Sequence, residues 1–79
     1  MSKKIIQKNI KLSGEFDQYI SDSSTAFRRI PDGAYIVITS ERDKALSEAN
    51  ISMARSSKSS NFVEAHKAHG KWEIKAFKK

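Results

Sequence analysis

The sequence contains no cysteine, a single proline and only three glycines. Without cysteine the chain has neither a disulfide nor a thiolate metal ligand, a composition that favours the cytoplasm. No apolar run approaches the roughly 18 residues of a membrane-spanning helix, and the basic start at residues 1–4 is not followed by the apolar segment of a signal peptide. We therefore expect a cytoplasmic protein that has no membrane partner and forms one small domain over residues 1–79.

Motifs that build catalytic sites are also missing. The glycines are isolated from one another, so the chain has no phosphate-binding glycine loop, and no serine occupies a nucleophile elbow. His66 and His69 are three residues apart with only Glu64 nearby, which is too small a ligand set for a metal ion. The sequence predicts a non-catalytic protein with no cofactor and no metal.

Positive charge is concentrated at the two ends of the chain, within a net charge of +6. Residues 1–12 carry four lysines and no acidic residue, and residues 58–79 carry six lysines against two glutamates. Basic ends can bind a polyanion, or they can keep the edge strands of a sheet soluble, and the second role is the more common one.

The clearest local pattern begins in the middle of the chain. Residues 35–39 form a short apolar, β-branched run that predicts a buried strand. Ser40 and Asp43 then resemble a capping pair, which predicts a helix over about 41–56. Its expected core stripe comprises Ala45, Leu46, Ala49 and Met53. Ile51 lies off this stripe, either as an isolated exposed residue or as part of a partner surface.

A β-hairpin is expected to close the domain. Residues 61–65 and 71–77 flank a turn that ends in Gly70. Alternation in the last segment directs Trp72 and Ile74 toward the core and the neighbouring lysines toward solvent.

The amino-terminal part carries weaker signals. Residues 5–12 alternate incompletely, which predicts a one-sided outer strand, and Ser13 with Gly14 predicts a chain reversal. Residues 31–33, Pro-Asp-Gly, predict a turn.

Two interpretations of residues 15–30 remain open. In the first, which we favour, an apolar helical stripe forms a short helix that is interrupted within the serine-rich residues 21–25. In the second, residues 16–20 and 26–30 are strands of two hairpins. Together these patterns predict an α+β fold with a mostly antiparallel sheet of three to four strands. The 41–56 helix would pack on one face, and a short helix could lie within 15–29.

Candidate binding residues come from one arginine pair and from the basic hairpin with its tail: Arg28, Arg29, Lys67, His69, Lys71, Lys75, Lys78 and Lys79. Such side chains attract phosphate, and an exposed Trp72 could stack on a base, although a core role for this tryptophan is the simpler assignment.

Two functions follow from these features. The first is a non-catalytic inhibitor or adaptor that binds a larger protein or nucleoprotein complex. In size and helix-on-sheet plan the chain resembles the small inhibitors that phages carry, including anti-CRISPR proteins, and this resemblance implies a protein target. The alternative is a small basic nucleic-acid-binding accessory protein. The sequence leaves the partner's identity and the oligomeric state open.

Overall fold

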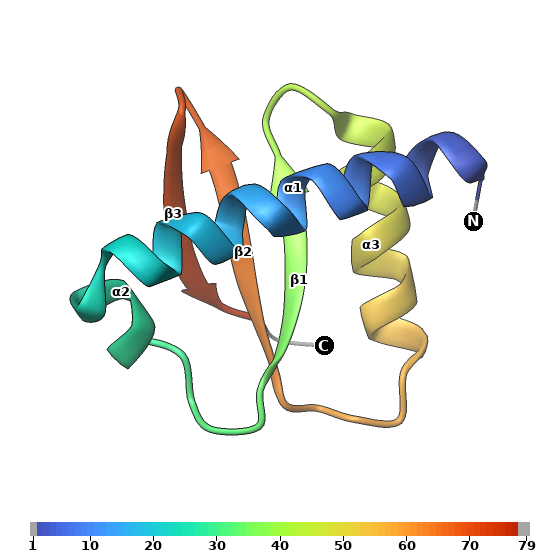
Figure 1. The fold of residues 1–79 in the computed structure, drawn as a ribbon. Helices are drawn as coiled ribbons and strands as arrows, with labels where there is room; N and C mark the ends of the chain where they lie inside the picture. Colours follow the sequence, from blue (N-terminus) through green and yellow to red (C-terminus); the bar gives the residue numbers. More distant parts are fainter. Residues whose placement is uncertain (1, 78–79) are drawn as a thin grey trace.

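Three helices and three strands make up the computed structural model, which describes residues 2–77 (Figure 1). In chain order they are α1 (Lys3–Asp22), α2 (Ser24–Arg28), β1 (Tyr35–Ser40), α3 (Lys44–Ser56), β2 (Phe62–Ala68) and β3 (Lys71–Ala76). Among these described residues, no helix combines the length and the apolar character needed to cross a membrane.

The strands form one mixed sheet in the order β1-β2-β3. β1 and β2 run parallel from the Tyr35–Phe62 pair to the Ser40–Lys67 pair, and β2 and β3 are antiparallel. α3 makes the crossover that a parallel pair requires. The expected α+β class is therefore confirmed, but the sheet contains one parallel and one antiparallel pair instead of being mostly antiparallel.

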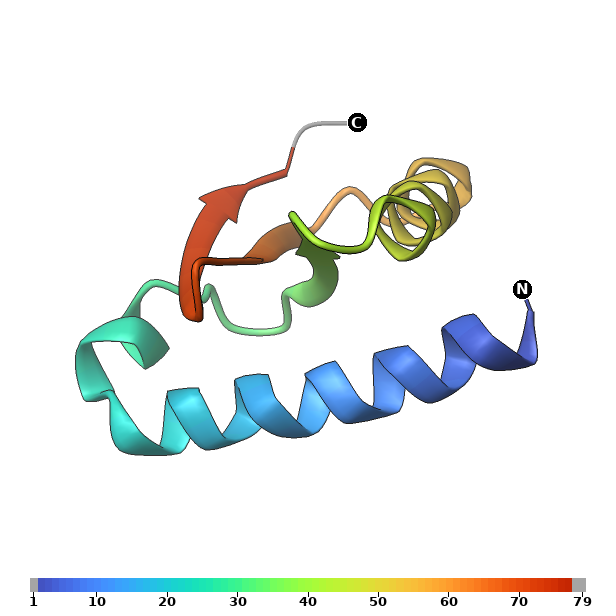
Figure 2. The same ribbon diagram turned by 90° about the horizontal axis from the view of Figure 1, so that it is seen from above.

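α1 runs across one face of the sheet, while α3 lies beside β1 (Figures 1 and 2). The buried Phe16 of α1 packs edge-on against Trp72 of β3, with ring centroids 5.1 Å apart. Register pairs Trp72 with Lys67 and Ile74 with Ala65, so these four side chains share the face that α1 covers. The expected core-facing side of the last strand is confirmed.

The outer strand predicted over residues 5–12 is wrong, because this segment is the first half of α1. Ser2 caps the helix by accepting a hydrogen bond from the Ile5 amide. The stripe that faces the interior includes Asn9, and this polar position conceals the helical period from an apolar count. The predicted reversal at residues 13–14 also fails, since both residues lie within α1.

The predicted interruption within residues 21–25 is confirmed at Ser23. This residue ends α1, and its hydroxyl accepts from the Ala26 amide to start α2. The two-hairpin alternative for residues 15–30 is therefore wrong. The predicted turn at residues 31–33 is present, with the Ala34 amide donating to the Pro31 carbonyl.

α3 begins later than expected. Asp43, and not Ser40, is its N-cap, and the Asp43 carboxylate accepts from the Leu46 amide. The buried positions of α3 are Leu46, Asn50 and Ala54, so the expected stripe is correct only at Leu46 and Met53 is exposed. The stripe shifts because the polar Asn50 is one of its buried members.

The closing hairpin is confirmed. β2 (Phe62–Ala68) continues beyond the expected end at residue 65, and β3 (Lys71–Ala76) ends one residue earlier than expected. His69 and Gly70 both have positive φ, as a two-residue hairpin turn requires. The Glu41 carboxylate accepts from the His69 amide at 2.7 Å and so holds the turn against the loop after β1.

Candidate functional site

The predicted basic residues lie in separate places. Arg28 ends α2 and Arg29 is its C-cap, and both are exposed. His69 lies in the turn between β2 and β3. Figure 1 places α2 toward the opposite end of the sheet. The arginine pair therefore does not join the hairpin in one surface.

Within the hairpin, the basic side chains are divided between the two faces of the sheet. Lys67 lies on the face covered by α1, where its ammonium contacts the Glu15 carboxylate and stands 5.8 Å from the Trp72 ring centroid. Lys71 and Lys75 point to the opposite face because they alternate with Trp72. Lys78 and Lys79 lie outside the described residues. No single phosphate-binding surface unites these positions among residues 2–77.

A polar cluster occupies the face of the sheet opposite α1. The Thr39 hydroxyl donates to Glu64 Oε2 at 2.5 Å and lies 2.7 Å from His66 Nδ1. His66 Nδ1 is 3.8 Å from the same carboxylate oxygen. Thr39 is only 2% exposed, so its hydroxyl cannot reach a substrate, and the cluster serves to satisfy a buried polar group. Among residues 2–77, no three side chains of the metal-binding types converge.

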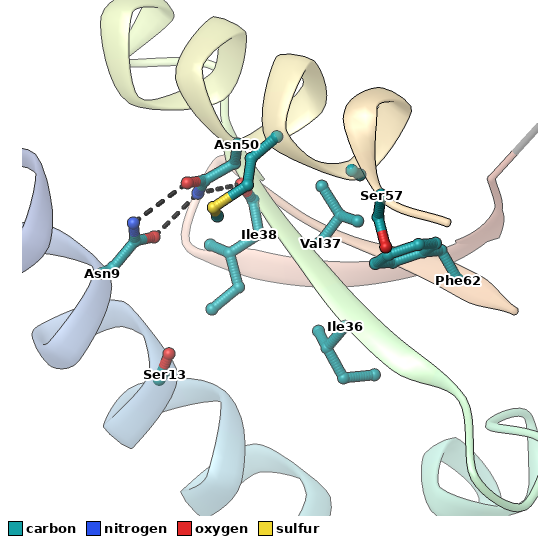
Figure 3. Close-up of a pocket in the computed structure, with 10 residues that line it drawn as sticks. Asn9, Ser13, Ile36, Val37, Ile38, Asn50, Ser57 and Phe62 are labelled. Atoms are coloured by element: carbon teal, nitrogen blue, oxygen red, sulfur yellow. Dashed lines mark hydrogen bonds between the residues drawn. The ribbon is translucent and has the colours of Figure 1, made fainter. Parts of the chain in front are cut away.

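A hollow lined mainly by apolar side chains lies between α1, β1 and α3 (Figure 3). It has a volume of about 440 Å³, within the range of small-molecule pockets. Its apolar lining comprises Ile36, Val37, Ile38, Met53, Ala54 and Phe62. Its polar lining comprises Asn9, Ser13, Asn50 and Ser57. We call this hollow the β1 groove.

Two asparagines close one end of the β1 groove. Asn9 Nδ2 donates to Asn50 Oδ1 at 3.0 Å, and Asn50 Nδ2 donates to Asn9 Oδ1 at 2.7 Å and to the Ile38 carbonyl at 2.8 Å. Figure 3 shows the two amides facing each other between α1 and α3, with Ile38 beside them. The pair thereby joins both helices to β1.

An ion pair holds the two helices together near the start of α3. Lys8 Nζ lies 2.8 Å from Asp43 Oδ2. The hydrogen bond from Lys8, together with the one from the Leu46 amide, holds the pKa of Asp43 below its ordinary value of 3.8. Because Asp43 is also the N-cap of α3, the ion pair positions one wall of the β1 groove against α1.

Exposed apolar side chains border the β1 groove. Met53, which lines it, is 57% exposed. Ile6 and Ile10 precede the lining residues Asn9 and Ser13 by three positions each, so they occupy the adjacent stripe of α1, and Ile10 is 69% exposed. These residues form what we call the apolar rim: Ile6, Ile10 and Met53.

A smaller hollow continues the apolar surface toward α2. It borders Ser13, Ile36 and Ile38, which also line the β1 groove, and extends to the exposed ring of Phe27. The two hollows therefore form one concave, mainly apolar surface between α1 and β1.

Sequence reasoning missed the apolar rim and the β1 groove. The sequence predicts a strand for Ile6 and Ile10 and a core position for Met53. The sequence signal for the rim is the spacing of four residues between the two isoleucines, which places both on one face of a helix. With them, the apolar stripe of that helix is wider than burial requires.

The fold and this groove define a class: a small α+β domain with a candidate binding groove beside an edge strand. The chain belongs to the family of unknown function DUF5647, whose model matches residues 4–73. No curated protein and no solved structure matches the chain.

Proposed function

We propose that this protein is a non-catalytic binding module, an inhibitor or adaptor that docks on a larger protein through the β1 groove and the apolar rim. The observation that carries the proposal is a hollow lined mainly by apolar side chains, with the exposed Met53 in its lining and the exposed Ile6 and Ile10 on the adjacent stripe of α1. Contiguous exposed apolar surface beside a groove is typical of protein-binding sites.

The placement of charge favours a protein partner over the nucleic-acid alternative. A nucleic-acid surface needs several unpaired cations on one face together with accessible aromatic rings. Here Lys67 is paired with Glu15, Lys75 lies 3.9 Å from Glu73, and Trp72 packs on Phe16. These contacts occupy three of the groups that would contact phosphates and bases.

The non-catalytic part of the proposal is supported by the chemistry of the polar cluster. Thr39 is the nucleophile type closest to a histidine, yet its hydroxyl already contacts Glu64 and His66 and is buried. A nucleophile has to reach its substrate, which this position does not allow.

The experiment is a pull-down from cell lysate with the tagged full chain, with and without nuclease and at two salt concentrations. We expect a defined protein that survives both treatments. Met53→Glu and Ile10→Glu should abolish its capture, because each places a charge on the apolar rim.

Lys71→Ala and Lys75→Ala serve as matched surface controls on the opposite face of the sheet, and they should retain the partner. The opposite pattern would overturn the proposal. If nucleic acid co-purifies, recovery collapses with nuclease or salt, and only the lysine variants lose it, the protein is a nucleic-acid binder.

A further inference from the structure

We infer that the outer edge of β1, inside the β1 groove, takes up an extended acidic segment of a partner protein as an additional strand. This inference rests on the proposed function and specifies how the partner is held.

The direction of the β1 backbone groups is set by the ladder with β2. Its first and last bonds run from the Tyr35 amide to the Asn61 carbonyl and from the Glu41 amide to the Lys67 carbonyl. Parallel strands use alternate residues for each neighbour, so the odd-numbered residues of β1 bond to β2. The backbone groups of Ile36, Ile38 and Ser40 consequently point away from β2.

α3 satisfies only part of this outer edge. The Ser47 hydroxyl accepts from the Ser40 amide at 2.9 Å and donates to the Ser40 carbonyl, and Asn50 donates to the Ile38 carbonyl. The next buried position of α3 toward its end is Ala54, which has no polar side-chain atom. Within residues 2–77, no hydrogen bond occupies the outward amide and carbonyl of Ile36 or the amide of Ile38.

The β1 groove provides room at this place. Figure 1 shows β1 and α3 diverging toward the carboxyl end of α3, where the hollow of about 440 Å³ lies. An added strand would pair with Ile36 and direct alternate side chains toward Met53 and Phe62 in the lining. Backbone bonds would provide affinity and the apolar hollow would provide selectivity, as in other cases of strand addition.

Charge complementarity identifies the occupant as acidic. α1 supplies one wall, and its residues 3–14 include no acidic residue and, besides Lys8, which is paired with Asp43, three lysines. α3 and the loop after it supply the other wall, and residues 49–63 include Lys58 and no acidic residue, while Arg55 borders a different hollow. A second copy is a poor occupant, because its free edge strand β3 carries Lys71 and Lys75.

The test uses a displayed library of random 12-residue peptides, selected on the full chain. We expect enriched peptides in which apolar residues alternate with other residues and Asp or Glu is abundant. One such peptide is then synthesised with N-methyl groups on either of the two alternate sets of residues. Methylation of the set that faces β1 should weaken binding by about tenfold or more, since it removes strand hydrogen bonds, and methylation of the other set should change it little.

Two further readouts use the folded protein. Binding should slow hydrogen exchange at the Ile36 and Ile38 amides, which are unpaired in the free chain. Met53→Glu should weaken binding of the acidic peptide more than Met53→Lys, matched in position and exposure, because both lose an apolar contact but only glutamate adds charge repulsion.

Several outcomes would overturn the inference. These are selection of basic or neutral peptides, no peptide enrichment, equal effects of both methylation patterns, and no protection at Ile36. If the protein sediments as a dimer and the Ile36 amide is protected from hydrogen exchange without peptide, a second copy occupies the outer edge of β1. If any of these is found while Met53→Glu still abolishes partner capture in the pull-down, strand addition fails but the proposed function stands.

Discussion

At the scale of single residues, Asn50 is the polar side chain on which the packing of α1, β1 and α3 converges. It is 5% exposed, and its amide bonds to Asn9 and to the Ile38 carbonyl. A buried amide is tolerated in a core only when its hydrogen bonds are made, and no buried side-chain polar atom of the described residues lacks a partner.

Asn50→Ala should destabilise the protein by about 1–3 kcal/mol, because it removes the hydrogen bonds from Asn50 to the Ile38 carbonyl and to the Asn9 amide. The measurement is the shift in the urea unfolding midpoint at constant slope. Ser52→Ala, on the exposed side of the same helix, should change stability by less than about 0.5 kcal/mol. Equal midpoints for the two variants would contradict the role given to Asn50.

The pH dependence of stability should report Asp43. Because Lys8 and the Leu46 amide lower the pKa of Asp43 in the folded state, folding favours its carboxylate form. The resulting stabilisation is fully present above the ordinary pKa of 3.8 and is lost as the pH falls through the lower, folded-state pKa.

Asp43→Asn keeps a capping side chain but cannot ionise, so its stability should decline less steeply below about pH 4 than that of the unsubstituted chain. Denaturant titrations from pH 2 to 7 would measure this. Parallel pH profiles for the two proteins would show that the ion pair with Lys8 contributes nothing.

At the scale of elements, α1 and the β2–β3 turn each contain a glycine, and the two glycines differ in backbone conformation. Gly14 lies in the middle of α1 without a positive φ, and a Cβ there would meet no atom within 4 Å. Gly70 has equally open surroundings, but its φ is +73°. Space is equal at the two positions, so only the backbone conformation distinguishes them.

Gly14→Ala should stabilise the protein by about 0.5–1 kcal/mol, because alanine is the better helix former. Gly70→Ala should destabilise it by about 1–2 kcal/mol, because a Cβ disfavours positive φ. Thermal unfolding of both variants measures the two effects. If Gly14→Ala were destabilising, residues 13–14 would not lie within a continuous helix.

At the scale of the whole molecule, one aromatic contact attaches α1 to the sheet. Phe16 is 4% exposed and packs on Trp72 of β3, and its ring centroid is 6.1 Å from that of Tyr19. A chain of 79 residues has a thin core and a correspondingly small net stability.

Phe16→Ala should cost about 3–5 kcal/mol, a large share of the roughly 5–10 kcal/mol expected for such a domain. We expect a loss of cooperative thermal unfolding and of the near-ultraviolet dichroism of Trp72. Phe27→Ala, which removes an exposed ring of the same size, should leave both signals nearly unchanged. Similar effects of the two variants would place the core elsewhere.

The elements that the sequence predicted correctly are those whose signals lie within a few neighbouring residues. The β-branched run at 35–39, the break at Ser23 and the turn at Gly70 each depend on local backbone preferences, and each is present in the structure. The basic candidate residues were found by composition alone, which gives no information on the face of the sheet to which each side chain points.

By itself, the sequence determined β1, the carboxyl-terminal hairpin, the approximate extent of α3 and the α+β class. Tertiary structure alone decided that residues 3–14 are helical, that β1 and β2 run parallel, and that a groove lies between β1 and α3. These features depend on contacts between distant segments, such as the Asn9–Asn50 pair across 41 positions. A polar residue is recognisable as a core residue only when its hydrogen-bonding partner is in place, and that partner is brought to it by the fold.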